Sequence, residues 1–549
     1  MPDRRRASDA ADLVFLGASV VSRGRPLAGV DALAVSNGRI CALGRSADLR
    51  DLVDTRTEVV QMRDRSLMPG FQDAHVHPVA GGLGLLQCDL SEETTTDGYL
   101  RLIDHYARRS PNLDWITGSG WSMDVFPGGR PTRELLDRVV TDRPAYFRNR
   151  DSHGSWANSR ALSLAGIDAH TPDPTGGRIE RDPDGAPTGL LHESASELVA
   201  AQIPEPTDDA ILDALEVGQR HLHSLGITAW QDAIVGNYLG MPNPLRTYVR
   251  AAENGILTAR VVGALWWQPD KGDEQIAELV DLRERCAVGR FKPTTVKIML
   301  DGIVETRTAS MLAPYCGHEH EPSATSFVDP QALKVYVTLL DRAGFQVHIH
   351  AVGDRAVREA LDAIDEARRV NGPNDNRHQI AHLDVVHPDD QPRFAALGVV
   401  ANIQPLWATH EPQMDQFKLP LLGPERSQWS FPFGALEHHR TPLAAGSDWM
   451  VSSADPLAGI HVAVHRTRAD LTDPPFLPEQ RLDLATALEA YTAGSAWANH
   501  LDHATGTLEV GKRADLVALD CDLHADPLQP IADSHVIATY VDGQAVHRS

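Results

Sequence analysis

Leu67-Met-Pro-Gly-Phe-Gln-Asp-Ala-His-Val-His-Pro78 is the stretch around which this sequence is organised. His75 and His77 stand two residues apart, and residues i and i+2 of a β-strand point to the same face. Two neutral imidazoles that converge on one point are suitable ligands for a divalent transition metal such as zinc. An isolated His-x-His more often represents two surface histidines beside a proline turn. The remainder of the chain decides between these two interpretations.

The form Pro-Gly-Phe-x-Asp-x-His-x-His resembles the first-strand motif of the amidohydrolase superfamily, whose members are metal-dependent hydrolases built on a TIM barrel. Later motifs resemble the amidohydrolase family 3 branch, which includes YtcJ-like proteins and N-substituted formamide deformylase. The resemblance extends over nearly the whole chain, from about Leu13 to Val546.

Composition narrows the classes of protein that the chain can represent. The formal net charge of −24 disfavours a nucleic-acid partner, because phosphates would be repelled. No apolar stretch approaches the ~18 residues of a membrane span, and no apolar signal-peptide core follows the basic N-terminus. The five cysteines lie far apart and form no Cys-x-x-Cys pair. We therefore expect a cytoplasmic protein without a membrane partner.

The two ends of the chain differ from its middle. Residues 12–66 and the region after residue 506 consist of short strand-like runs with turns, whereas the middle alternates strand-like and helix-like runs, which favours βα units. Together with the resemblance, this pattern predicts an α/β fold: a (β/α)8 TIM-type barrel with a large insertion after its first strand, plus a small β-sandwich formed by both termini. The expected parts are residues 1–66 (N-terminal part of the sandwich), 67–500 (barrel, with the insertion at 79–220) and 501–549 (C-terminal part of the sandwich).

The insertion should lie at the catalytic face, because loops that follow barrel strands carry function. His153, within Asn149-Arg-Asp-Ser-His-Gly-Ser155, is therefore a candidate substrate contact, with a loop-packing histidine as the alternative. Trp121, Trp156 and Glu193 are weaker candidates for the pocket lining. The aromatic residues of the insertion favour an apolar or aromatic leaving group, unless they form the insertion's own core; they are Trp115, Trp121, Phe126, Tyr146 and Phe147.

A lysine interrupts the apolar run Thr295-Val-Lys-Ile-Met-Leu-Asp-Gly302. A lysine buried in a strand is costly unless it is paired or bound, so Lys297 needs a partner. The resemblance implies that Lys297 is the fourth-strand lysine, which in amidohydrolases can be carboxylated and bridge two metals. An unmodified lysine beside a single metal, with Asp301 as its partner, is the alternative.

Three later strands complete the set of ligands that the resemblance implies. His350 lies in His350-Ala-Val-Gly-Asp354, His382 in Ala381-His-Leu-Asp384, and Asp448 closes the run Leu443-Ala-Ala-Gly-Ser-Asp448. A carboxylate at the end of a barrel strand is placed where barrel enzymes carry out catalysis. His348 shares a strand face with His350, and we interpret it as a neighbour rather than a ligand. The predicted metal ligands are His75, His77, Lys297, His350, His382 and Asp448.

These residues predict a hydrolase that holds one or two zinc ions, other divalent metals being an option. Asp448 would act as general base and then general acid, and His382 or His153 would hydrogen-bond the substrate carbonyl. The expected reaction is hydrolysis of a carbon–nitrogen bond in a small non-peptide amide, such as an N-substituted formamide. Hydrolysis of an ester, carbamate or cyclic imide, a decarboxylase or isomerase reaction, and a non-catalytic binding protein remain alternatives. The expected partner is a small molecule, and a homodimer, common in the superfamily, is an option.

Overall fold

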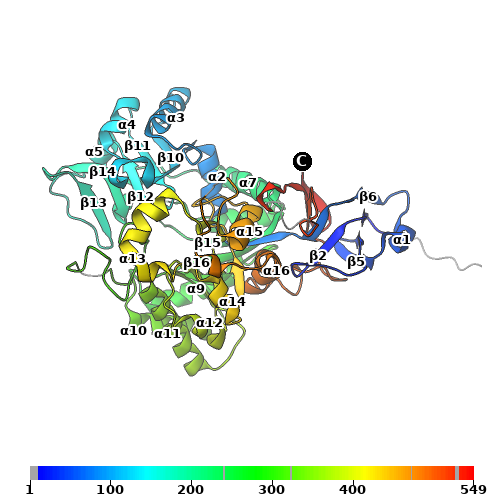
Figure 1. Cartoon of the computed structure of the whole chain (residues 1–549). Coiled ribbons are helices and arrows are strands. Elements are labelled where there is room, and N and C mark those ends of the chain that lie inside the picture. The colour runs from blue at the N-terminus through cyan, green and yellow to red at the C-terminus, as the bar shows by residue number, and fades with distance from the viewer. Residues whose placement is uncertain (1–9, 239–240, 322–323, 471–472, 526–530) are drawn as a thin grey trace, which may run out of the picture.

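An eight-stranded parallel sheet, rolled into a nearly closed barrel, lies at the centre of the computed structural model (Figure 1). The structure describes residues 10–238, 241–321, 324–470, 473–525 and 531–549. Neighbouring strands pair in sequence order, which confirms the predicted α/β barrel. The barrel strands are β8 (Phe71–Val76), β15 (Ile227–Val235), β16 (Arg260–Trp266), β17 (Phe291–Met299), β18 (Gln346–Ala351), β19 (Gln379–His382), β20 (Val400–Ile403) and β21 (Leu443–Ala445).

The alternation of residues along the strands separates a polar interior from an apolar outer layer. In β18, Val347 and Ile349 belong to the hydrophobic core, whereas His348 contacts His75 across the barrel. Every residue of β18 is buried, because helices cover the outside of the sheet and side chains fill the inside. Polar residues on the inner face can therefore persist only where they find hydrogen-bond partners.

Helices form the outer layer of the barrel (Figure 1). Helix α11 (Asp354–Asn371) buries Val357, Leu361 and Ile364, which recur every three or four residues on one face. In the described part of the chain no helix combines the length and the apolar character that crossing a bilayer requires. The other helices around the barrel are α2 (Pro78–Leu86), α7 (Asp208–Ser224), α8 (Leu245–Glu253), α9 (Ile276–Cys286), α10 (Pro330–Arg342), α12 (Gln391–Leu397), α13 (Leu419–Ser427), α14 (Phe433–His438), α15 (Pro456–His465), α16 (Leu484–Glu489) and α17 (Ser495–Ala498).

Two further sheets lie beside the barrel and take strands from the ends of the chain. The first contains β1 (Leu13–Leu16), β4 (Ala32–Ser36), β5 (Arg39–Gly44) and β6 (Glu58–Gln61), with α1 (Ser46–Leu49) nearby. The second has the order β24-β23-β22-β7-β2-β3 and so joins both ends of the chain. Strand β7 pairs with β22, so the barrel begins at β8, slightly after the expected boundary between residues 66 and 67. The strands of the second sheet are β2 (Ser19–Ser22), β3 (Arg25–Pro26), β7 (Ser66–Pro69), β22 (Leu516–Leu519), β23 (Val536–Val541) and β24 (Gln544–Arg548).

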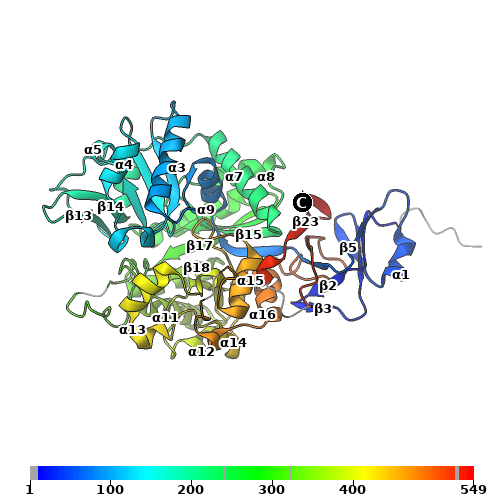
Figure 2. The same cartoon turned by 45° about the horizontal axis from the view of Figure 1, so that its top comes forward.

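Between β8 and β15 the chain forms a separate six-stranded sheet with its own helices (Figure 2). Trp121, Phe126, Phe147 and Trp156 pack together in one hydrophobic cluster of this insertion. Its elements are β9 (Cys88–Asp89), α3 (Thr96–Arg109), β10 (Ile116–Trp121), α4 (Arg133–Val139), β11 (Ala145–Asn149), β12 (Gly154–Ala157), α5 (Ser159–Leu164), β13 (Gly177–Arg181), β14 (Pro187–Glu193) and α6 (Ala195–Ala200).

Candidate metal centre and cavity

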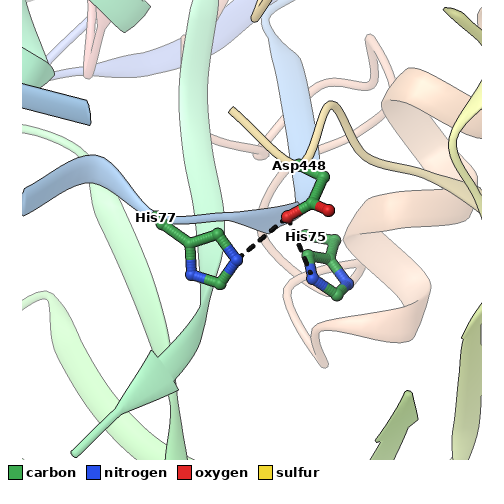
Figure 3. Close-up of side chains that lie close together, drawn as sticks. All are labelled: His75, His77 and Asp448. Carbon is green, nitrogen blue, oxygen red and sulfur yellow. Dashed lines mark hydrogen bonds and ion pairs between the residues drawn. The ribbon is translucent and has the colours of Figure 1, made fainter. Parts of the chain in front are cut away.

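Two histidines and one carboxylate converge where the first and last barrel strands end (Figure 3). His77 Nε2 lies 2.9 Å and His75 Nε2 3.4 Å from Asp448 Oδ1. The candidate ligand atoms of the three residues all lie within 4.8 Å of one another. Imidazole nitrogens and a carboxylate oxygen are ligands that zinc accepts, so this group fits a divalent ion on donor chemistry alone.

Asp73 connects the two strands that carry this group. Its buried carboxylate accepts hydrogen bonds from the backbone N–H of His75 (3.0 Å) and from the hydroxyl of Ser447 (2.5 Å). The backbone N–H of Asp448 in turn donates to the carbonyl of His75, over 2.7 Å. Asp448 has a left-handed backbone (φ 54°), a conformation that costs energy in non-glycine residues and is concentrated at functional sites. These contacts explain why the first-strand motif contains an aspartate two residues before its first histidine.

A hydrogen-bonded chain inside the barrel sets the tautomer of His75. Gln231 donates through its amide nitrogen to Thr295, so its carbonyl oxygen faces His348 Nδ1. His348 Nδ1 must therefore carry the proton, and His348 Nε2 accepts from His75 Nδ1, 2.9 Å away. The lone pair of His75 consequently lies on Nε2, the atom that faces Asp448. His348 is thus in direct contact with a candidate ligand.

Lys297 lies on β17 with its amine facing the same group. Its Nζ is 3.5 Å from His75 Nε2. Burial lowers the pKa of Lys297 to about 7, against the opposing charge of Asp448. Asp301, considered above as its partner, instead accepts hydrogen bonds from the backbone N–H groups of Ser310, Val352 and Gly353, so that suggestion was wrong.

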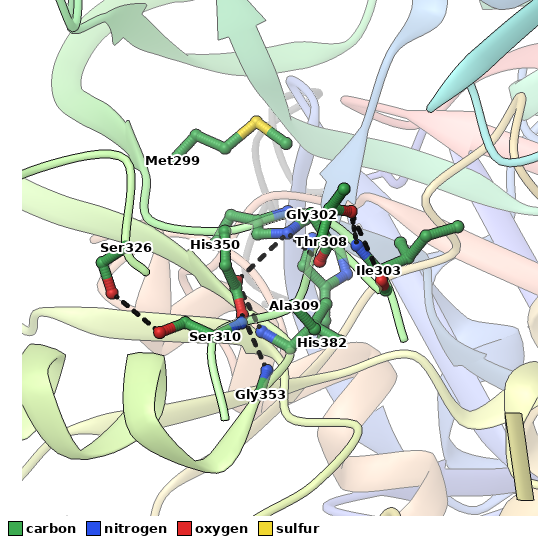
Figure 4. A network of polar contacts seen from close by, with 12 residues as sticks. Met299, Gly302, Ile303, Thr308, Ala309, Ser310, Ser326, His350, Gly353 and His382 are labelled. Atoms are coloured by element: carbon green, nitrogen blue, oxygen red, sulfur yellow. Dashed lines mark hydrogen bonds and ion pairs between the residues drawn. The ribbon is translucent and has the colours of Figure 1, made fainter. Parts of the chain in front are cut away.

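His350 and His382 extend the site along the strand ends. Their ring centroids are 4.3 Å apart, and His350 Nε2 lies 3.5 Å from the carbonyl oxygen of Gly302 (Figure 4). His382 Nδ1 is 4.0 Å from Asp448 Oδ2 and has no hydrogen-bond partner among the described residues, although it is buried. A buried nitrogen without a partner is costly, which a bound ion would relieve. Trp407 stacks on the His382 ring at 5.3 Å.

The local electrostatics favour uncharged imidazoles. Burial lowers the pKa of His75, His350 and His382 well below the usual histidine value, and the charge of Lys297 contributes to each shift. A neutral imidazole keeps a lone pair, which metal coordination requires. The histidines are therefore in the protonation state that suits ligands.

His153 faces this group from the insertion and differs from it in charge. Its Nδ1 lies 3.0 Å from both carboxylate oxygens of Glu193, and its ring centroid is 5.8 Å from that of His350. Burial alone would lower the pKa of His153, but Glu193, with smaller contributions from Asp151 and Asp448, raises it to about 9. His153 is therefore a cation at neutral pH beside a set of neutral imidazoles.

All the residues predicted for the site line one cavity of about 1060 Å³; they are His75, His77, His153, Lys297, His350, His382 and Asp448. Only His75, His77 and Asp448 form the closest candidate ligand group in the described part of the chain. The suggested lining was wrong: Trp121, Trp156 and Glu193 do not line the cavity, and the two tryptophans are fully buried in the core of the insertion. The sequence interpretation missed residues of the cavity wall whose positions depend on loops, namely Tyr238, Glu305, Trp407 and Lys418.

Comparison with known proteins identifies the family. The model of the Amidohydrolase family matches residues 58–547. The chain is 30% identical over 547 residues to Protein LONG AFTER FAR-RED 3 of Arabidopsis thaliana, covering 98% of this chain and 92% of that protein. It is 28% identical to the putative amidohydrolase YtcJ of Bacillus subtilis (94% and 96% covered) and 26% identical to N-substituted formamide deformylase of Arthrobacter pascens (97% of each).

A solved structure shares the fold. An uncharacterized metal-dependent hydrolase from Pyrococcus furiosus superposes with a TM-score of 0.70 at 27% identity, covering 93% of this chain and 99% of that one. These matches confirm the resemblance drawn from the sequence motifs and place the barrel and its flanking sheets among hydrolases of known architecture.

Proposed function

This chain belongs to the amidohydrolase family, and we propose that it is a zinc-dependent hydrolase of carbon–nitrogen bonds other than peptide bonds, with an N-substituted formamide as a representative substrate. The observation that carries the proposal is the convergence of His75, His77 and Asp448 at the strand ends of the barrel. Imidazole nitrogens and one carboxylate oxygen form the donor set expected of a hydrolytic zinc site.

The residues that would hold the metal follow from this arrangement. His75, His77 and Asp448 would form the primary group, with His350, His382 and a carboxylated Lys297 available for a second ion. Zinc held there would supply Lewis-acid chemistry, making water a stronger nucleophile and the substrate carbonyl more electrophilic.

The side chains supply the proton transfers. Asp448 lies beside both His75 and His77, so its carboxylate is placed to accept the proton of the attacking water as general base. The protonated carboxyl then returns that proton to the leaving nitrogen. His153, as a cation facing the cavity, donates a hydrogen bond to the carbonyl oxygen, where negative charge develops. His382 is the other residue considered for this contact.

Two observations support a small amide as substrate. The cavity of about 1060 Å³ has room for a substituted amide and lies at the carboxyl ends of the strands, where barrel enzymes bind substrates. N-substituted formamide deformylase, a relative whose name states its reaction, is 26% identical to this chain along nearly its whole length. The substrate class proposed here takes its chemistry from that relative.

The test is to incubate the purified, metal-loaded protein with N-substituted formamides in heavy-oxygen water. We expect formate and the free amine in equal amounts, with one heavy oxygen atom in the formate. Chelation of the metal should stop the reaction. Turnover without oxygen incorporation would point to a decarboxylase or isomerase, and the absence of turnover on formamides, esters, carbamates and imides would reject the proposal.

Two further properties stay predictions. The first is that the protein forms a homodimer, and light scattering of the purified protein, which measures its mass in solution, tests this. A cytoplasmic location is expected from the scattered, unpaired cysteines and is tested by fractionation of the source cells.

A further inference from the structure

Glu193 and His153 form a buried pair, in which Glu193 has no role in the proton transfers of the proposed reaction. Both carboxylate oxygens of Glu193 lie 3.0 Å from His153 Nδ1, and the two side chains are only 5% and 10% exposed. A carboxylate shielded from water interacts strongly with an imidazolium. Glu193 is the last residue of β14 and His153 immediately precedes β12, and these two strands pair antiparallel, so the sheet of the insertion holds the two residues side by side.

Several contacts fix the position of the Glu193 carboxylate. Thr308, from the loop after β17, donates its hydroxyl to Glu193 Oε1 over 2.9 Å. The backbone N–H of Glu193 donates to the carbonyl of His153, and the backbone of Glu193 has a left-handed conformation (φ 50°). A Cβ atom on Gly302 would lie 2.5 Å from Glu193 Oε1, so only glycine leaves room for this carboxylate.

The same loop connects the pair to the candidate metal centre. The carbonyl oxygen of Gly302 lies 3.5 Å from His350 Nε2, and the hydroxyl of Thr308 accepts from the backbone N–H of Ile303 (Figure 4). The loop after β17 thus positions a candidate ligand and the Glu193 carboxylate together.

The other ring nitrogen of His153 is available to a bound molecule. His153 lines the cavity, and its Nε2 hydrogen-bonds none of the residues that the structure describes. With Nδ1 held by Glu193, Nε2 remains for a hydrogen bond to a molecule bound in the cavity. The buried Glu193 carboxylate, 3.0 Å from Nδ1, favours the imidazolium form of His153, in which both ring nitrogens carry protons.

We propose that Glu193 is a positioning residue, which with Thr308 holds His153 so that its Nε2–H points at the substrate's carbonyl oxygen. This inference rests on the proposed function, because the oxygen that His153 would contact belongs to the proposed substrate. Glu193 itself touches no reacting atom and acts only through His153. Such a donor contributes most when the oxygen becomes negative in the transition state, and less to substrate binding.

The insertion contains a matched pair that serves as control. His192 Nε2 lies 3.3 Å from Glu180 Oε2, and both side chains are about as buried as the first pair. Neither residue lines the cavity. Glu180 also lies 3.2 Å from Arg130 Nη1 and 3.5 Å from Arg178 Nε, so Glu180→Gln removes a more extensively paired carboxylate from the same sheet without touching the proposed contact.

The first measurement does not require activity. Nuclear magnetic resonance of metal-free protein labelled at the histidine ring nitrogens should show a strongly downfield proton on His153 Nδ1, identified by its loss in His153→Gln. We expect Glu193→Gln to shift this resonance upfield or remove it and Glu180→Gln to leave it in place. A resonance that is absent from the wild type, or that Glu193→Gln leaves unchanged, would overturn the proposed pair.

The second measurement is a mutant cycle on the best formamide substrate. His153→Gln should lower kcat by ~10²–10³-fold, with a smaller change in KM. Glu193→Gln should lower kcat in the same manner, and the double variant should be no slower than His153→Gln alone, because Glu193 acts through His153. If the losses of kcat in His153→Gln and Glu193→Gln multiply in the double variant, the positioning role is overturned. A loss of kcat in Glu180→Gln as large as that in Glu193→Gln would overturn it too. If the wild-type protein hydrolyses no amide, the proposed function is rejected. The resonance of His153 Nδ1 would then still test the pair that His153 forms with Glu193.

Discussion

His348 Nε2 and His75 Nδ1 are 2.9 Å apart inside the barrel, and this contact determines which nitrogen of His75 is free for a metal. The direction of the proton follows from Gln231, whose carbonyl oxygen can only accept from His348. Residues that orient a ligating histidine in this manner typically raise metal affinity ~10–100-fold.

The first prediction concerns this contact. His348→Leu should leave the barrel folded but weaken metal binding by ~10–100-fold, because His75 loses the acceptor that fixes its tautomer. Titration of the metal-free protein against a competing chelator measures the affinity. Since His348 is not among the proposed ligands, the number of ions bound at saturation should not change. Unchanged affinity would show that the His75 tautomer is set elsewhere.

The second prediction concerns the proposed general base. Asp448→Asn keeps the shape of the side chain and an oxygen that can ligate, but it removes the negative charge that accepts a proton. We expect kcat to fall by at least ~10²–10⁴-fold while metal remains bound through His75 and His77. Metal content by elemental analysis is compared with turnover on the same sample. Retained turnover would reject the role of Asp448 in proton transfer.

The third prediction concerns Lys297 and the number of metal ions. Burial lowers the pKa of its amine to about 7, so a large fraction is uncharged at neutral pH, the form that adds to carbon dioxide and releases a proton. We expect intact mass to show one added carbon dioxide, and elemental analysis to give about two zinc ions per chain, the number that a bridging carbamate would hold.

A matched substitution tests this assignment. Lys297→Met should lose the added mass and at least one ion. Lys292→Met, on the same strand but exposed to solvent, should lose neither. About one zinc ion with no added mass in the wild type would instead favour a single-metal site beside an unmodified lysine.

The strand ends of the barrel could be predicted because they follow local rules. Each barrel strand is a short apolar run, and in a parallel sheet the residue that closes such a run lies at the same edge as its counterparts. Asp448 after Leu443–Ala445 and His382 at the end of β19 are examples. The family motifs added the order of these residues, and the structure places all of them around one cavity.

The contacts between elements could not be predicted, because they depend on register and loop paths. Glu193 meets His153 only because β14 pairs antiparallel with β12, which no local pattern reveals. The prediction that two tryptophans line the cavity was wrong for a related reason. The insertion is large enough to need its own core, and Trp121 and Trp156 fill it.

The last prediction concerns stability at the opposite end of the barrel from the site. Asp341, near the end of α10, accepts hydrogen bonds from the side chains of Asn371, Asn374 and Asn376 and from His378 Nε2, over 2.7–2.9 Å. Although burial opposes ionisation, these hydrogen bonds together hold the pKa of Asp341 well below its usual value. A carboxyl with a depressed folded-state pKa stabilises the fold above the unfolded pKa, ~3.9, and loses that contribution as the pH falls below it.

Asp341→Asn should therefore lower the thermal unfolding midpoint at pH 7, since hydrogen bonds to a charged group contribute ~1.5–3 kcal/mol each and the new amide cannot accept from all four donors. The difference between variant and wild type should begin to shrink as the pH falls below about 5, because Asp341 of the unfolded wild-type chain then takes up a proton while the folded carboxylate, with its depressed pKa, stays ionised. Asp375→Asn is the control: its side chain is 71% exposed and, among the described residues, pairs with Arg377 alone, so its effect should be small at every pH. A penalty for Asp341→Asn that is independent of pH would mean that the shape of the side chain, and not its charge, holds this end of α10 in place.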